Sequence, residues 1–246
     1  MFSLGRESYT IPIDRVRCGE SAAFVIPSNA DMKLISVNVG LPSEVEANGG
    51  SVTTGIFKQP VAGPIRVERL NLIGDRQADL SVHGGTFKAV YAYPSEHYAY
   101  WRDKLAQSNL PWGMFGENLT SEGLHEGAVY IGDRYRVGTA ELIVTQPRTP
   151  CYKLGIRFGR PEIIKLFLNS GRSGFYFAVA QEGELKSGDS IELVGREANS
   201  LTVADINRLY SFEKDNREML GRAVQIKGLS ENWRNYFLEQ LQRMSD

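Results

Sequence analysis

The sequence predicts a mainly β protein of the α+β class, a β-barrel followed by a small helical domain. From Lys33 to Gly195, short runs of β-branched and aromatic residues alternate with glycines, which indicates many short strands. The segments 127–138 and 183–195 faintly resemble each other, and each has a Gly-Asp turn between two short β runs, as in a hairpin. After Gly195 the apolar residues follow helical spacing. Many short strands joined by such turns favour a barrel or sandwich over a parallel α/β sheet.

Composition limits the classes of function. The chain has 246 residues and a formal net charge of -1, so it can bury a sizeable core, and its charge does not favour nucleic-acid or membrane partners. The two cysteines, Cys18 and Cys151, are too few for a disulfide framework. Neither a signal peptide nor a long apolar run is present, so we expect a cytoplasmic, reducing location and no membrane span.

Three parts are expected along the chain. Residues 1–31 carry only short apolar patches and are interpreted as an N-terminal extension, in which Cys18 has no assigned role. At Met32 the chain enters an alternating strand, and residues 32–195 are predicted as the β domain. Residues 196–246 are predicted as the C-terminal helical domain. The predicted strands are Lys33–Val39, Arg66–Leu72, Lys88–Tyr93, Val129–Ile131, Tyr135–Thr145, Phe175–Ala180 and Ser190–Val194.

Two helices are expected to interrupt the strands. The first opens at Pro94, is capped by Ser95 and carries Tyr98, Trp101 and Leu105 at helical spacing. The second begins at Pro161 and ends near Gly171. The side chains that the second helix is expected to bury are Ile163, Ile164, Phe167 and Leu168.

Three further helices are expected in the C-terminal domain. Thr202 and Asp205 fit a capping box that opens a helix ending at Leu209. Ser211 is expected to cap a helix over about 213–223, and Ser230 is expected to cap a third helix. These helices are too short to be stable alone, so we expect them to pack on one another and on the barrel. The apolar stripe of the third helix consists of Trp233, Tyr236, Phe237, Leu241 and Met244.

Cys151 is the principal candidate for chemistry. It follows the predicted strand ending at Thr145, in a loop stiffened by Pro147 and Pro150 and flanked by Arg148 and Lys153. A nearby cation raises the thiolate fraction of a cysteine, and a thiolate is both a nucleophile and a ligand for soft metals. The alternative from local context is a small apolar residue that fills a gap in the core.

Polar and glycine-rich clusters between Lys58 and Leu119 are the second candidate feature. Taken singly, each is more simply explained by local hydrogen bonding or solvation in a loop. No phosphate-binding loop, dinucleotide fingerprint or zinc-type Cys/His spacing is present. His83, His97 and His125 have no ligand spacing, and His97 is expected to be structural because aromatic residues flank it in a helix.

Six motifs occur in a fixed order along the chain, and together they closely resemble the MOSC family, named for the C-terminal domain of molybdenum-cofactor sulfurase. The resemblance extends from about Met32 to the C-terminus and is strongest to the bacterial YiiM-type subgroup, in which a MOSC domain precedes a short helical domain. The motifs are Thr54–Lys58, Gly74–Asp79, His83–Gly85, Tyr91–Pro94, Phe115–Leu119 and Gln146–Cys151.

The resemblance implies a MOSC-type β-barrel that binds the molybdenum cofactor (molybdopterin), with Cys151 as molybdenum ligand. It also implies reduction of N-hydroxylated compounds such as hydroxylaminopurine bases, with electrons from a separate redox protein. A soft thiolate suits molybdenum, and Lys58 and Arg148 suit an anionic, phosphate-bearing cofactor. The predicted cofactor-binding residues are Lys58, His83, Gly84, Gly85, Gly116, Asn118, Arg148 and Thr149.

The residues leave several points open. Reduction of an N-hydroxyl group needs a proton source, for which Asp75, Asp79 and His83 are candidates; Cys151, Asp75 and His83 are the predicted catalytic residues. The alternatives to the reductase are a sulfur-transfer protein with a persulfide on Cys151 and a non-catalytic carrier of the cofactor. The helical tail and the N-terminal extension are natural places for a homodimer contact.

Overall fold

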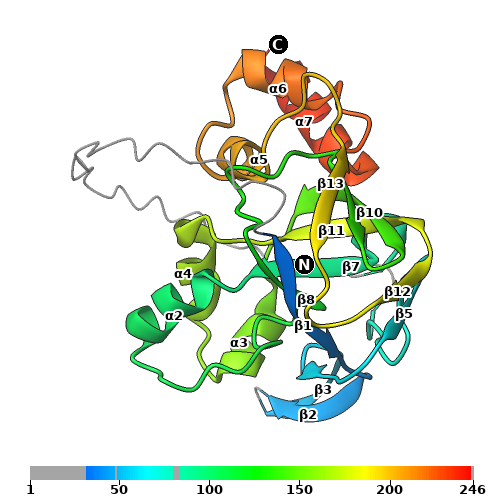
Figure 1. The fold of residues 1–246 in the computed structure, drawn as a ribbon. Coiled ribbons are helices and arrows are strands. Elements are labelled where there is room, and N and C mark those ends of the chain that lie inside the picture. Colours follow the sequence, from blue (N-terminus) through cyan, green and yellow to red (C-terminus); the bar gives the residue numbers. More distant parts are fainter. Residues whose placement is uncertain (1–31, 48, 80–83, 245–246) are drawn as a thin grey trace.

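The computed structural model describes residues 32–47, 49–79 and 84–244, so the predicted extension 1–31 lies outside the described residues. The described chain is a mixed α+β fold with one large sheet, six α-helices and a helical C-terminal part (Figure 1). No helix of the described residues is long and apolar enough to cross a membrane. The large sheet orders its strands as β13 (Ile191–Gly195), β9 (Arg134–Val137), β10 (Ala140–Pro147), β11 (Phe175–Gln181), β7 (Val90–Pro94), β8 (Leu119–Glu122), β1 (Lys33–Val39) and β4 (Gln59–Pro60).

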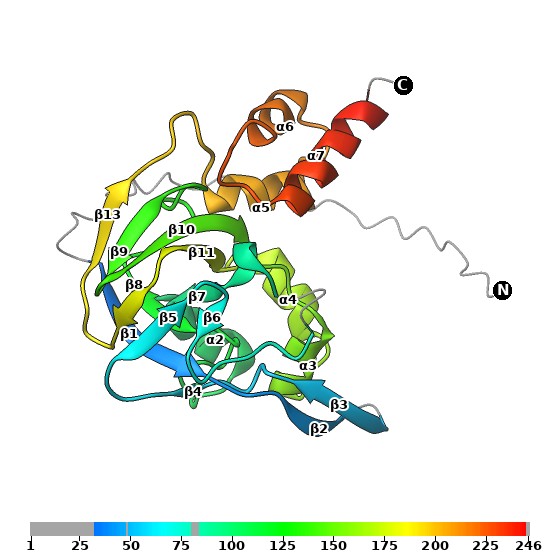
Figure 2. The same cartoon turned by 90° about the vertical axis from the view of Figure 1, so that its right-hand side faces the viewer.

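All neighbouring strands of the large sheet are antiparallel except β7 and β8, which are parallel. The predicted barrel stays a prediction, because the strand order of the sheet runs from β13 to β4 and these two edge strands do not pair with each other. The ends are nevertheless close: Leu34 of β1 donates to the Asp189 carbonyl (2.9 Å), and Ile191 of β13 donates to the Met32 carbonyl (2.9 Å). In Figure 2 the strands curve around a common interior.

The predicted strand Tyr135–Thr145 is divided into β9 and β10 by a turn at Gly138. Gly138 has φ +58°, and a Cβ there would lie 2.2 Å from the Glu184 carbonyl oxygen. The turn therefore needs glycine for both its conformation and its close approach to the neighbouring backbone. In β9, Tyr135 and Val137 are buried and alternate with exposed residues, as expected for a strand with one solvated face.

Other strand predictions are corrected in detail. The predicted strand Arg66–Leu72 is a tight hairpin of β5 (Ile65–Glu68) and β6 (Asn71–Leu72), and Lys88 belongs to the 3-10 turn η2 (Thr86–Lys88) that precedes β7. Val129–Ile131 is not a strand, and only an isolated bridge joins Tyr130 to Thr202. The strands that the sequence did not indicate are β2 (Ser43–Ala47), β3 (Gly50–Thr54), β4 and β8. The first β run of the predicted hairpin 183–195 is β12 (Gly183–Leu185), but β12 pairs with β5 and β13 pairs with β9, so the two runs do not pair with each other.

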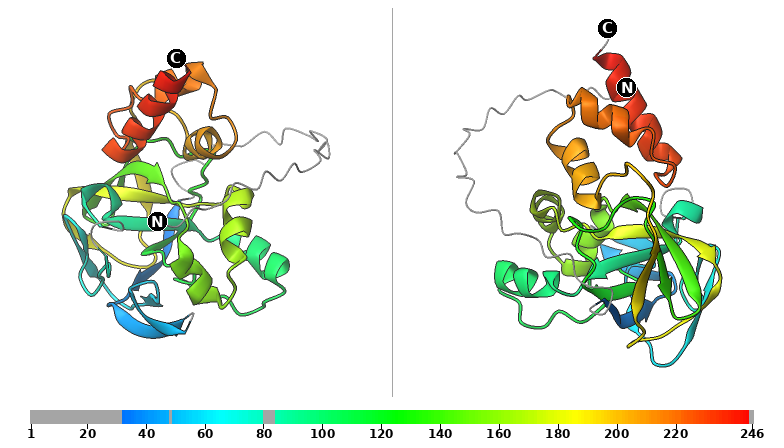
Figure 3. Two further views of the ribbon diagram at one scale, coloured as in Figure 1. Left: turned by 180° about the vertical axis from the view of Figure 1, so that it is seen from behind. Right: turned by 45° about the horizontal axis from the view of Figure 1, so that its top comes forward.

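Three helices, α2 (His97–Leu105), α3 (Tyr152–Phe158) and α4 (Ile163–Ser170), lie together at one side of the sheet in Figure 1 and again from behind in Figure 3. They enclose a second core, separate from the one inside the sheet, that is dominated by aromatic side chains such as Trp101 and Phe115.

The predictions for these helices were wrong in several places. Glu96, not Ser95, is the N-cap of α2. The second predicted helix begins at Ile163 rather than Pro161, and its Leu168 is 39% exposed rather than buried. The helix α3 was not predicted.

The C-terminal helices are α5 (Val203–Ser211), α6 (Arg217–Ala223) and α7 (Glu231–Arg243), which lie at one end of the sheet (Figure 1). The Thr202–Asp205 capping box is confirmed, with Asp205 N–H donating to Thr202 Oγ1 (3.0 Å) and Thr202 N–H to Asp205 Oδ2 (3.1 Å). The cap of α6 is Asn216 rather than Ser211, because the helix starts later than predicted.

The helices share the main core with the sheet, as expected, through buried Ile206, Leu220 and Phe237. The third helix buries Trp233 and Phe237 of the predicted stripe, whereas Met244, at its C-terminal end, is 37% exposed.

Candidate functional site

The loops between the strands form a pocket, which is lined by residues from the segments 54–58, 76–78, 116–118 and 148–153, among others. Six of the residues predicted from the sequence line it together: Lys58, Gly116, Asn118, Arg148, Thr149 and Cys151. These residues come from three separate segments of the chain, so the fold brings most of the predicted site to one place. The remaining lining residues are Thr54, Gly55, Ile56, Arg76, Gln77, Ala78, Lys88, Tyr91, Lys153 and Tyr176.

Cys151 lies between the end of β10 and the start of α3, with extended backbone (φ −119°, ψ 172°). Its side chain is partly exposed in the pocket and is not part of a disulfide. Cys18 lies outside the described residues. The structure therefore places one thiol of the described chain in a pocket, at the exit of a strand, where the sequence predicted it.

Arg148 is the most unusual charge of the site. Its guanidinium lies over the rings of Tyr91 (4.8 Å to the centroid) and Phe167 (5.3 Å), and Nη1 is 3.5 Å from the Tyr91 hydroxyl. The residue is only 6% exposed, and among the described residues no carboxylate forms an ion pair with it. Burial by itself lowers the pKa of Arg148, but the neighbouring Tyr91, Tyr176 and Cys151 outweigh burial and raise it. Since a buried charge is costly without an opposite charge, this cation is suited to an anionic ligand.

Lys58 is also buried, but the protein supplies its counter-charge. Its Nζ forms an ion pair with Asp75, whose carboxylate also accepts hydrogen bonds from Gly40 N–H (2.9 Å) and Asn118 Nδ2 (2.9 Å). Burial lowers the pKa of Lys58 although Asp75 and Glu117 favour its charged form. Asp75 is 2% exposed and does not line the pocket. Its contacts make it an anchor for Lys58 and Asn118, whereas its predicted catalytic role stays a prediction.

The loop before β8 is built around buried Glu117. This carboxylate accepts hydrogen bonds from Gly113 N–H (2.8 Å), Phe115 N–H (3.1 Å) and Thr120 Oγ1 (2.9 Å), and from the Tyr98 hydroxyl. Burial raises the pKa of Glu117, against the effect of these hydrogen bonds. The carboxylate thereby fixes the backbone that carries Gly116 and Asn118 into the pocket.

Gly116 is required at its position. It has φ +77°, and a Cβ there would lie 2.8 Å from Ile56 Cγ1, so the loop contacts the opposite pocket wall closely. The other predicted glycines, Gly84 and Gly85, do not line the pocket; Gly85, with φ +95°, precedes η2 and thus leads the chain to Lys88. His83 lies outside the described residues. Cofactor binding by Gly84, Gly85 and His83 stays a prediction.

Several pocket residues had no predicted role, among them Lys88, Tyr91 and Tyr176. Tyr91 and Tyr176 have ring centroids 5.2 Å apart, and burial raises the pKa of both, so both hydroxyls remain protonated. Lys88 is half-buried, and burial lowers its pKa. Because Arg76 and Lys153 also line the pocket and no carboxylate of the described residues does, the described lining is positively charged.

A cofactor with anionic groups and a metal that accepts sulfur fits this pocket better than a metal ion bound by protein alone. Among the described residues, no group of three or more His, Cys, Asp or Glu side chains is arranged to hold a metal ion. The described part of the site instead offers one thiol, several cations and the buried guanidinium of Arg148, which has no carboxylate partner there.

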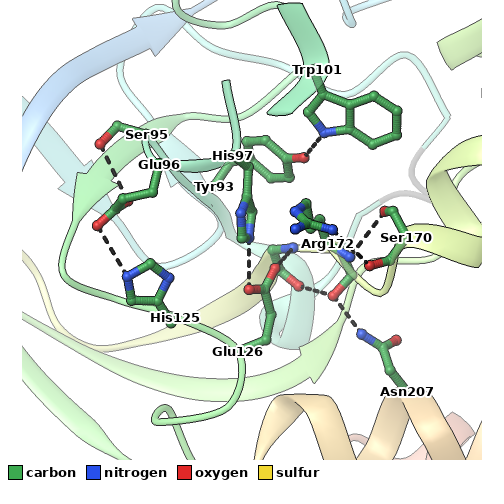
Figure 4. Close-up of polar contacts among 12 residues, drawn as sticks. Tyr93, Ser95, Glu96, His97, Trp101, His125, Glu126, Ser170, Arg172 and Asn207 are labelled. Carbon is green, nitrogen blue, oxygen red and sulfur yellow. Dashed lines mark hydrogen bonds and ion pairs between the residues drawn. The ribbon is translucent and has the colours of Figure 1, made fainter. Parts of the chain in front are cut away.

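Away from the residues that line the pocket, two histidines far apart in the sequence come together, with ring centroids 6.2 Å apart (Figure 4). Each histidine pairs with the glutamate that is adjacent in sequence to the other histidine. His97 Nε2 lies 2.8 Å from Glu126 Oε2, and His125 Nε2 lies 3.3 Å from Glu96 Oε1. Burial tends to raise the pKa of Glu96, but hydrogen bonds from His125 and Gly123 N–H lower it to about 2. The bond to Glu96 in turn raises the pKa of His125. The expected structural role of His97 agrees with its pairing to Glu126.

Comparison with known proteins identifies the family to which this arrangement of a large mixed sheet and a helical C-terminal part belongs. The family model for the MOSC domain matches residues 79–192, and the model described as "YiiM-like, 3-alpha helix domain" matches residues 201–243. The chain therefore belongs to the MOSC family, in its YiiM-like branch. The domain boundaries predicted at residues 32, 195 and 196 stay predictions.

Three relatives illustrate this membership. An uncharacterized protein of Bacillus subtilis, YflK, is 39% identical over 211 residues, covering 86% of this chain and 95% of the relative. The crystal structure of YiiM from Geobacillus stearothermophilus is 38% identical, with a TM-score of 0.73, and the match covers 85% of this chain and 99% of that one. A protein of Gibberella moniliformis named "Reductase" is 34% identical over 183 residues, which are 73% of this chain but 32% of the relative.

Proposed function

We propose that this protein binds the molybdenum cofactor and reduces N-hydroxylated compounds to the corresponding amines, with Cys151 as a molybdenum ligand. Membership of the MOSC family supports a function related to this cofactor, and the fungal relative named "Reductase" supports an oxidoreductase. The observation that carries the proposal is the buried guanidinium of Arg148 in a pocket that also holds the thiol of Cys151 and that no carboxylate of the described chain lines. Such a pocket offers an anionic, sulfur-bound metal cofactor both a soft ligand and opposite charge.

The residues of the chain have separable roles in this proposal. Cys151 supplies the thiolate, and Arg148, with Lys153 and Arg76 nearer the surface, neutralises the anionic groups. The Asn118 amide is already committed to Asp75 and to Tyr91 N–H (3.1 Å), so it shapes the wall rather than donating freely to a ligand. Lys58 is likewise neutralised by Asp75.

When bound, the cofactor supplies the two-electron chemistry, and a separate redox protein supplies the electrons. The overall reaction consumes two electrons and two protons for each N–OH bond that is broken, and it releases water and an amine. Lys88 lines the pocket, and its lowered pKa brings it closer to neutral pH than a solvated lysine, which suits a proton donor. We therefore add Lys88 to Asp75, Asp79 and His83 as a candidate proton donor.

Metal analysis tests the proposal most directly. Protein produced in cells that make the cofactor is expected to contain about one molybdenum per chain and to reduce an N-hydroxylated purine with an artificial electron donor. A Cys151→Ser variant is expected to lose both, whereas the matched variant Cys18→Ser keeps both. A wild-type protein without molybdenum but with cyanide-labile sulfur would instead support persulfide transfer. Stoichiometric cofactor without reduction of any N-hydroxylated substrate would support a carrier.

A further inference from the structure

One side chain of the C-terminal helices reaches the scaffold of the pocket. Asn207 of α5 donates from Nδ2 to Ser173 Oγ at 2.7 Å, and Figure 4 shows its amide pointing from the helix toward the segment between α4 and β11. Asn207 is half-buried, and the Ser173 residue is 5% exposed. A buried hydroxyl held in this way has a defined orientation.

The turn at Ser173 and Gly174 contacts two pocket residues directly. The Ser173 carbonyl accepts the hydrogen bond of the Tyr91 hydroxyl at 2.8 Å. Ser173 Oγ donates to the Gly174 carbonyl (2.6 Å), and the same carbonyl accepts the backbone N–H of Arg148 at 3.4 Å. The orientation of this turn therefore affects both the ring under the Arg148 guanidinium and the backbone of Arg148.

The turn has little freedom to adjust. Gly174 has φ +60°, and a Cβ there would lie 2.3 Å from the Ala92 carbonyl, so the turn is in close contact with β7. Glu126 Oε1 accepts the Gly174 N–H at 2.7 Å, and its other oxygen pairs with His97. The turn is thus held from one side by Glu126 and from the other side by Asn207.

Arg148 depends on this scaffold because no carboxylate of the described chain holds it. Its guanidinium is located by Tyr91 and Phe167, through ring contacts at 4.8 Å and 5.3 Å. The loop of Arg148 and Thr149 also separates the pocket from a smaller cleft, which α5 lines with Asn207 and other residues. Arg148 and Thr149 therefore line the pocket and also a cleft whose wall includes residues of the helical domain.

We propose that Asn207 is a positioning residue, through which the C-terminal helical domain sets the orientation of Arg148 toward an anionic group in the pocket. This inference rests on the proposed function in taking the pocket as an anion site. It gives the helical domain a role in the site although none of its described residues lines the pocket.

The test uses the full-length protein, purified without cofactor, in a Cys18→Ser background so that Cys151 is the remaining thiol. Binding of inorganic phosphate is measured by calorimetry, and the rate of Cys151 alkylation by iodoacetamide is measured with and without phosphate. The variants are Asn207→Ala, Ser173→Ala and the double variant. Arg208→Ala is the matched control, because this neighbouring residue pairs with Asp205 and Glu213 at the surface instead.

Asn207→Ala is expected to weaken phosphate binding about five-fold, the effect of one neutral hydrogen bond. It is also expected to reduce the protection of Cys151 by a given phosphate concentration. The double variant is expected to bind no more weakly than Ser173→Ala, since both changes remove the same contact. Arg208→Ala is expected to bind as the parent does. Alanine is a strong helix former, so α5 is retained in these variants.

Two results would overturn the inference. One is an Asn207→Ala protein with a lower melting temperature but unchanged phosphate binding and alkylation, since its role would then be purely structural. The other is a parent protein that binds no phosphate, because Arg148 would then have no anion to be positioned for. Molybdenum content decides the proposed function separately, so the failure of one can be distinguished from the failure of the other.

Discussion

Replacing Asp75 with asparagine distinguishes an anchoring carboxylate from a catalytic one. The change keeps the size of the side chain and removes the charge that compensates buried Lys58. It also replaces an oxygen acceptor with an NH₂ donor, although the carboxylate accepts from Lys58, Gly40 N–H and Asn118 Nδ2. In either orientation of the new amide, at least one of these donors faces another donor.

The expected loss of stability follows from the two effects. Removing one partner of a buried ion pair costs about 3–5 kcal/mol, because the other charge stays buried and uncompensated. A displaced buried donor costs about 1–3 kcal/mol, and part of this overlaps with the first cost. We therefore expect Asp75→Asn to lower the free energy of unfolding by at least about 4 kcal/mol. Lys58→Met is expected to cost less, because Asp75 keeps its hydrogen bonds from Gly40 and Asn118.

Urea unfolding followed by circular dichroism measures this loss. With a slope of about 2–3 kcal/mol per molar urea, the midpoint of Asp75→Asn is expected about 1.5 M below that of the wild type. The matched control is Glu122→Gln, which breaks an exposed ion pair with Lys33 (3.2 Å). It is expected to cost less than about 1 kcal/mol. If Asp75→Asn unfolds like the control and yet abolishes reduction, the anchoring role is refuted and a catalytic Asp75 is supported.

Two other predictions concern stability. Because the pKa of Glu96 is lowered to about 2, its interactions stabilise the protein above the usual glutamate pKa and are lost as pH falls from about 5 to 2. For a partly exposed carboxylate we expect these interactions to contribute about 1–2 kcal/mol to the free energy of unfolding. The free energy of unfolding of Glu96→Gln should therefore fall less steeply than that of the wild type as the pH is lowered through this window. Equal slopes for the two proteins would contradict this. Gly174→Ala is expected to cost about 3 kcal/mol or more in urea unfolding, from positive φ and the clash with Ala92. Gly171→Ala has similar φ (+66°) but open space, so it should cost only about 1–2 kcal/mol, and equal losses would refute the steric argument.

Local sequence signals predicted the elements that carry a clear local pattern. The alternating run Lys33–Val39 is β1 with both bounds as expected, and the Thr202–Asp205 capping box opens α5. In contrast, α3 has seven residues, includes Gly155 and is held by the packing of Leu154 in the second core, which local sequence does not reveal. The hairpin of β2 and β3 was missed because its side chains are mostly exposed and show no apolar alternation.

Some residues of the site could be predicted from the sequence, whereas others could not. Motifs indicated Lys58, Asn118, Arg148 and Cys151, because each stands in a conspicuous glycine- or proline-bounded stretch. Tyr176 had no such signal. It reaches the pocket because the register of β10 and β11 places it opposite Gln146, two residues before Arg148. Such pairing is a property of the whole sheet and cannot be inferred from one segment.

The two buried cations of the site show why tertiary structure was needed to separate binding from support. By sequence, Lys58 and Arg148 were equal candidates for holding an anionic cofactor. In the structure Lys58 is neutralised by Asp75, which leaves it little charge for a ligand. Arg148 is equally buried, but in the described part of the chain its guanidinium contacts aromatic rings and the Tyr91 hydroxyl rather than a carboxylate, so its charge is available to the pocket. Among the described residues no carboxylate pairs with this buried charge, so Arg148, more than Lys58, is suited to bind an anion in the pocket.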